Sequence, residues 1–123
     1  MYETKNFKVA TDPKLVCSCC GQGGPSVALL ILLETIRAHF NAGVSISSCS
    51  RCKEYNKSEG GGKNSEHLID DTGTSDAADI NVTGVTPTQV RKYLKELPYA
   101  NLLGIGKYVD FTHVDVRGYG ARW

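Results

Sequence analysis

Ala78-Asp79-Ile80-Asn81-Val82 is a short stretch in which apolar and polar side chains alternate. Alternation of this kind predicts a strand with one buried face, which places Asp79 on the face opposite Ile80. The preceding segment, residues 69–75, has four Asp or Thr residues out of seven and predicts a loop. We therefore expect the Asp79 carboxylate to lie where side chains from other elements can converge.

On the N-terminal side of this strand the pattern predicts one helix, one strand and a loop. Apolar residues recur at helical spacing from Leu29 to Phe40, and Asn41-Ala42-Gly43 predicts the end of that helix. Val44-Ser45-Ile46-Ser47 alternates and predicts a second strand. Residues 50–62 are polar and rich in glycine, so we expect a loop there.

On the C-terminal side, Thr86-Pro87-Thr88-Gln89 has the form of a capping box with proline at the first helical position. It opens a helix that ends before Pro98. Residues 102–108 and 111–116 predict a closing pair of strands. The expected class is α+β, with helices packed on a small antiparallel sheet.

Length and composition limit the classes of function. A chain of 123 residues predicts one domain, residues 1–123, and 41% hydrophobic with 22% charged residues is ordinary for a globular protein. A formal net charge of +1 without a dense basic run gives no reason to expect nucleic acid. No apolar stretch reaches the length of a membrane span, so we expect no membrane insertion, and we expect a monomer. Residues 1–5 lack a signal-peptide pattern, and we expect a protein made in the cytoplasm.

Two histidines and a carboxylate are the residues that suggest chemistry. His67, Asp79 and His113 supply nitrogen and oxygen donors of the kind that bind zinc, and a hydrolytic zinc site keeps its fourth position for water. Asp110, three residues before His113, is the candidate general base. Asp115 faces the same way as His113 in a strand, either supporting it or forming a surface ion pair.

Five cysteines are many for this length, and their state is open. Disulfides and reduced, partly buried thiols are two of the alternatives. The third is a structural zinc ion on two Cys-x-x-Cys pairs; these pairs are Cys17, Cys20, Cys49 and Cys52.

Several segments match one family when they are taken together. They are Ser50-Arg51, Tyr55-Asn56, Lys63-Asn64-Ser65-Glu66-His67-Leu68, Ala77-Ala78-Asp79-Ile80, Gly104-Ile105-Gly106-Lys107-Tyr108, Phe111-Thr112-His113-Val114-Asp115 and Ala121-Arg122-Trp123. The sequence resembles the M15 zinc peptidases, which include D-alanyl-D-alanine carboxypeptidases and L-alanyl-D-glutamate endopeptidases with the hedgehog-type fold. The resemblance is closest to the single-domain branch found in phage lysins and murein endopeptidases.

The family motif is Ser-x-His-x-x-Gly-x-Ala-x-Asp, and this sequence departs from it in the middle. Ser65 and His67 match the start, and Ala77 and Asp79 match the end, but His and Asp lie twelve positions apart here and seven apart in the motif. The extra residues fall in the loop 69–75, where an insertion has a small entropic cost. We therefore keep Asp79 as the expected ligand.

The resemblance implies a role for each candidate residue. His67, Asp79 and His113 would hold one zinc ion, and Asp110 would take a proton from the attacking water and pass it to the leaving amine. Arg51 would bind a substrate carboxylate or polarise the scissile carbonyl, a task suited to a planar guanidinium. Ser65 would bind backbone or substrate.

The resulting hypothesis is a zinc metallopeptidase that hydrolyses a peptidoglycan stem-peptide amide, such as a phage endolysin acting on the cell wall after release. The alternatives are a D,D-carboxypeptidase or dipeptidase, and a zinc-containing module that binds peptide or cell wall with little turnover.

Overall fold

The computed structural model describes residues 2–123 and contains a five-stranded sheet with helices around it. The strands are β1 (Val44–Ser48), β2 (Ala77–Val82), β3 (Gly104–Lys107), β4 (Thr112–Asp115) and β5 (Ala121–Arg122). The helices are α1 (Val27–Phe40), α2 (Lys53–Ser58) and α3 (Pro87–Glu96), with short 3-10 turns at Pro13–Leu15 and Ala100–Leu102. The predicted α+β class is confirmed. In the described residues, no helix has the length and apolar character needed to cross a membrane.

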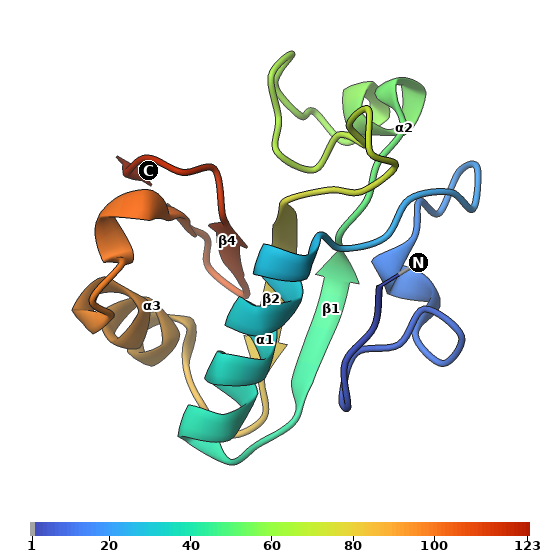
Figure 1. Ribbon diagram of the computed structural model, residues 1–123. Coiled ribbons are helices and arrows are strands. Elements are labelled where there is room, and N and C mark those ends of the chain that lie inside the picture. The colour runs from blue at the N-terminus through green and yellow to red at the C-terminus, as the bar shows by residue number, and fades with distance from the viewer. Residues whose placement is uncertain (1) are drawn as a thin grey trace.

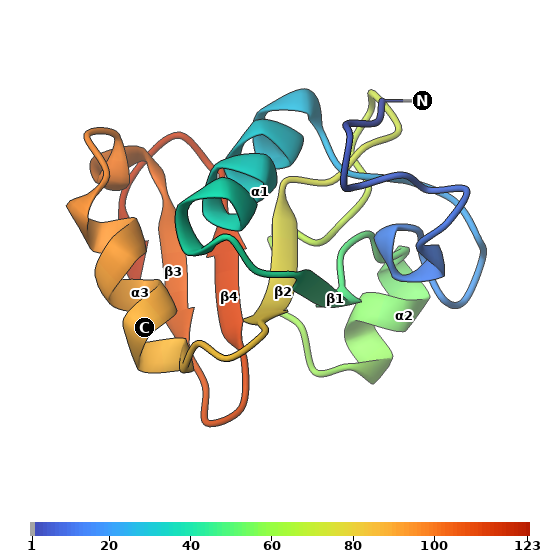
Figure 2. The same ribbon diagram turned by 90° about the horizontal axis from the view of Figure 1, so that it is seen from below.

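The strand order is β1-β2-β4-β3-β5, and Figure 2 shows the first four strands side by side. These four pair antiparallel, as predicted. The short β5 pairs parallel to β3, so the sheet as a whole is mixed. Only two residues form β5, and a segment this short carries no alternation that a sequence pattern could reveal.

Helix α1 crosses one face of the sheet, as Figure 1 shows. The Ser26 side chain accepts a hydrogen bond from Leu29 N at its start, and Asn41, in the left-handed conformation, ends it. Its buried leucines and Ile36 pack with the inward residues of the strands, among them Ile80, Ile105 and Val114. This layer forms the hydrophobic core.

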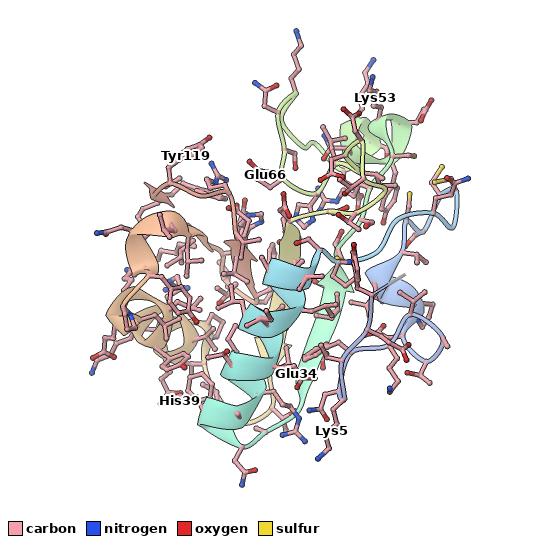
Figure 3. The ribbon with its side chains drawn as sticks, viewed as in Figure 1. Lys5, Glu34, His39, Lys53, Glu66 and Tyr119 are labelled. Atoms are coloured by element: carbon pink, nitrogen blue, oxygen red, sulfur yellow. The ribbon has the colours of Figure 1, made fainter. Side chains whose placement is uncertain are left out.

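Helix α3 begins with the predicted capping box, in which Thr86 and Gln89 bond to each other's backbone. It packs against β2, β3 and β4, and its Tyr93 stacks on His39 of α1 at a ring distance of 3.7 Å. His39, the third histidine of the chain, therefore has a packing role. Figure 3 shows it at the opposite end of the molecule from Glu66.

The segment 50–62 differs from the expectation of a loop, because it contains α2. The helix has six residues, and the Cys52 thiol accepts a hydrogen bond from Tyr55 N at its start. A helix this short lacks the apolar repeat from which longer helices are predicted.

Candidate metal centre and cleft

The sheet face away from the core carries the polar residues. Asp79 on β2 lies directly opposite His113 on β4 in the antiparallel register, and Asp115 lies opposite Ala77. Because side chains alternate along a strand, the register that places Ile80 and Val114 in the core also places Asp79 and His113 together on the other face.

His67 reaches this face from the loop before β2. Its carbonyl accepts a hydrogen bond from Arg51 N at 2.8 Å, and Ile69 N donates to Arg51 O at 3.2 Å. These two backbone hydrogen bonds hold the loop that carries His67 against the segment that follows β1. The inserted residues form a compact turn in which Asp70 O accepts from Gly73 N and the Asp70 carboxylate accepts from Thr72 N. The insertion thus leaves Asp79 beside both histidines.

Donor atoms of His67, Asp79 and His113 lie within 4.8 Å of one another, and all three residues are buried. His67 Nε2 is 3.2 Å and His113 Nδ1 is 3.1 Å from the same oxygen, Asp79 Oδ1. Three other acids lie in or next to the insertion, and none of them is a member of this group: Asp70, Asp71 and Asp76.

The second nitrogen of each imidazole is already engaged. His67 Nδ1 lies 2.7 Å from the carbonyl oxygen of Cys49, and His113 Nε2 lies 2.7 Å from Asp115 Oδ2. If each of these nitrogens donates its hydrogen, the nitrogens that face Asp79 are left with free lone pairs. Two lone pairs and a carboxylate oxygen within 4.8 Å of one another form a donor set that fits a divalent metal ion, with outer partners that fix the ring orientations.

The electrostatics of the group agree with this arrangement. Burial alone would raise the pKa of Asp79, but its hydrogen bonds with His113 and His67 outweigh burial and hold that pKa well below the usual range. Burial would lower the pKa of His113, whereas the hydrogen bonds to Asp115 and Asp79 raise it. A metal ion would therefore compete with a proton for His113.

Asp115 is fully buried and lies behind His113, on the side away from Asp79. Its carboxylate accepts from Arg117 Nε at 2.8 Å and Nη2 at 2.7 Å, and from Gly104 N at 3.2 Å. The sequence left two roles open for Asp115, support of His113 or a surface ion pair. Its burial and its contact with His113 correspond to support of His113.

Two glycines of β3 provide the space for these groups. A Cβ on Gly104 would lie 2.6 Å from Arg117 Nε and would also collide with the Asp115 carboxylate. A Cβ on Gly106 would lie 2.7 Å from the Trp123 ring and 3.0 Å from His113 Cβ. The Gly-x-Gly pattern therefore allows large side chains to cover this strand.

The Arg51 side chain is buried beside Asp79. Its Nη2 lies 3.3 Å from Asp79 Oδ2, and its Nε and Nη1 donate to Ser48 and Asn56 at 3.0 and 3.4 Å. Because Arg51 engages Oδ2, Oδ1 is left to face the histidines. Arg51 thus orients the carboxylate in addition to facing the cleft.

An open cleft of roughly 340 Å³ lies over this group. It is lined by Arg51, Glu59, Gly60, Gly61, Gly62, Ser65, Glu66, His67, Asp79, Tyr108, Phe111, His113, Arg117 and Trp123. All but one of the predicted ligand, catalytic and substrate-binding residues are in this lining. The exception is Asp110, which lies on the exposed turn between β3 and β4.

Sequence reasoning missed Glu66, Arg117 and Trp123 as cleft residues. Glu66 occupies a variable position of the motif, and burial raises its pKa. Figure 3 shows Glu66 on the side of the molecule where Tyr119 and the C-terminal segment lie. For Arg117 the available signal was its position two residues after Asp115, which puts both on one side of an extended segment.

A buried His-Asp-His group at the floor of an open polar cleft is the arrangement of a metal-dependent hydrolase. A family model described as Peptidase M15 matches residues 6–115, most of the chain, so this protein belongs to the M15 family and is a peptidase. M15 peptidases are zinc dependent, and His67, Asp79 and His113 are the residues that can hold the metal ion. In the other two comparisons, no curated protein and no solved structure matched the chain.

Proposed function

We propose that this protein is a zinc-dependent peptidase that hydrolyses an amide bond in the stem peptides of bacterial peptidoglycan. One observation carries the metal part of the proposal. His67 Nε2 and His113 Nδ1 approach the same oxygen of Asp79, while the other nitrogen of each ring has a separate acceptor. A zinc ion bound there would act as a Lewis acid that polarises the scissile carbonyl and activates water.

The chain's own residues would bind and orient the substrate. Arg51 and Arg117 bring two guanidinium groups to the cleft, and both are suited to carboxylates. Stem peptides are short and carry free carboxylates, so this lining supports an acidic peptide as the substrate. Ser65 and the glycine run 60–62 also line the cleft and offer hydroxyl and backbone polar contacts.

Two carboxylates are candidates for proton transfer. Asp110 has the position of the catalytic acid in the resemblance to M15 enzymes, but its side chain is on an exposed turn outside the cleft lining. Glu66 is part of that lining. A general base must come within hydrogen-bonding reach of the reacting groups. We therefore favour Glu66 and retain Asp110 as the alternative.

We also propose that the protein works as a monomer on the cell wall, after release from the cell that makes it, as a phage endolysin does. This part of the proposal comes from the resemblance to the single-domain lysin branch.

The test is mass spectrometry of the products formed from purified peptidoglycan by zinc-loaded protein. Cleavage within the stem supports the endopeptidase, whereas release of terminal D-alanine alone would identify a D,D-carboxypeptidase. His113→Ala, which removes one proposed ligand, is the control and should give no product. Retention on peptidoglycan with no product from the wild type would instead support a binding module.

A further inference from the structure

A second group of metal-binding side chains lies outside the cleft. The sulfur atoms of Cys17, Cys20 and Cys52 lie within 4.8 Å of one another. Cys17 and Cys20 come from the N-terminal segment, and Cys52 precedes α2, so the group joins parts of the chain far apart in sequence. All five cysteines are free thiols in this structure.

One of the alternatives left open by the sequence was a zinc site that includes Cys49, but Cys49 is not a member of this group. Cys49 is fully buried in the hydrophobic core with Leu29 and Ile80, because it continues inward from β1. Cys19 is adjacent to Cys20 in the sequence; its thiol is exposed and is not a member of the group.

The backbone around Cys17 is folded as a tight turn that supports a thiolate. Cys17 N donates to Gln22 O at 2.8 Å, and Gly21 N donates to Cys17 O at 2.7 Å. Cys52 N donates to the Cys17 sulfur at 3.3 Å. Burial alone would raise the pKa of Cys17, but hydrogen bonds from the backbone of Cys52, Cys20 and Cys19 outweigh it and lower the pKa to about 7.

We propose that Cys17, Cys20 and Cys52 bind a structural zinc ion, and that the exposed thiol of Cys19 turns inward to supply the fourth ligand. Four thiolates in tetrahedral geometry form a closed site with no position left for water, so this ion takes no part in hydrolysis. It ties the N-terminal segment to the start of α2, directly after Arg51 in the sequence. The site thereby stabilises the segment that positions Arg51 against Asp79.

The first test is metal analysis of protein purified under reducing, anaerobic conditions. The wild type should hold one thiolate-bound zinc ion per chain in addition to any ion at His67, Asp79 and His113. Cys20→Ser and Cys52→Ser should each lose that one ion, while His113→Ala should keep it. Cys49→Ser is the matched control, because it removes a thiol without touching the group, and it should also keep the ion.

Cobalt substitution gives a second readout that does not depend on activity. Thiolate-to-cobalt charge-transfer absorption should appear in the wild type and in His113→Ala, and it should disappear in Cys20→Ser. Cys20 is exposed, so this variant should still fold, which circular dichroism can verify. Cys19→Ser should weaken the charge-transfer band and give up its metal to a chelator more readily.

Four results would overturn the proposal. The first is wild-type protein without thiolate charge transfer, and the second is a band that persists unchanged in Cys20→Ser. The third is a disulfide among Cys17, Cys20 and Cys52 in freshly purified, metal-free protein. The fourth is the recovery of iron in place of zinc, which would overturn the assignment of the ion as zinc. Failure of peptidoglycan cleavage would leave these measurements unaffected, because they do not involve the cleft.

Discussion

Asp115→Asn tests whether the residue behind His113 sustains the metal centre. The substitution keeps the size of a fully buried side chain and replaces one acceptor oxygen by an NH₂ group. In the wild type, His113 Nε2 and Arg117 Nη2 each lie 2.7 Å from Asp115 Oδ2. If the remaining oxygen of the variant stays with Arg117 Nε and Gly104 N, the new NH₂ group faces these two nitrogens. Two charge-assisted hydrogen bonds become contacts between donors.

The expected magnitude follows from these contacts. Breaking a buried charged pair costs about 3–5 kcal/mol of stability, and the Arg117 side chain, 17% exposed, can recover part of this by turning to solvent. We expect the free energy of unfolding of the metal-free protein to fall by about 3 kcal/mol. Zinc affinity should fall 10–100-fold, the usual effect of removing the outer partner of a ligating histidine.

The assays are urea unfolding of metal-free protein and zinc titration against a chromophoric chelator. Asp110→Asn is the matched control, since its carboxylate is exposed and its loss should change stability by less than about 0.5 kcal/mol. If Asp115→Asn kept a zinc affinity within about twofold of the wild type and an unchanged stability, His113 would not depend on this contact.

Three further results are expected. Gly106→Ala should lower the unfolding free energy by about 1–3 kcal/mol and quench or shift Trp123 fluorescence, because the added methyl meets the Trp123 ring at 2.7 Å; unaltered fluorescence and stability would contradict this. In metal-free protein, the pKa of His113 is raised above its unfolded value of 6.5, so the protonated imidazole stabilises the fold. This contribution is complete below pH 6.5 and is lost as the pH rises through the folded pKa. Urea midpoints should therefore fall with rising pH more steeply in the wild type than in His113→Gln. Glu66→Gln should reduce kcat by about 10²–10⁴-fold with zinc binding retained, and Asp110→Asn should not; the reverse pattern would assign the base to Asp110.

Much of the fold could be predicted because its signals are local. The capping box at Thr86 and the stop at Asn41 depend on bonds between neighbouring residues, and both are present. Alternation in β2 predicted which face carries Asp79, since that depends only on strand geometry. Helix α2 was missed because six residues with a thiol cap have no apolar period, and β5 was missed because two residues have no pattern.

The candidate site depended on a different kind of information. Three ligands from a loop and two strands meet only through the register of β2 on β4, which no local pattern specifies. The resemblance to a family supplied that long-range information for His67, Asp79 and His113. It could not do so for Asp110, whose place depends on how the turn between β3 and β4 projects its side chain.

The two histidines and the carboxylate of the metal centre are each held by a different part of the chain. His113 depends on Asp115 of its own strand and on Arg117 just after that strand, and His67 depends on the Cys49 carbonyl. Asp79 depends on Arg51, which lies between the core residue Cys49 and the proposed thiolate site at Cys52. Within the loop, the turn from Asp70 to Thr74 closes on its own backbone, while Ile69 N keeps the loop bonded to Arg51 O. This explains why five added residues between His67 and Asp79 leave the ligands together, whereas changing one buried support is expected to separate them.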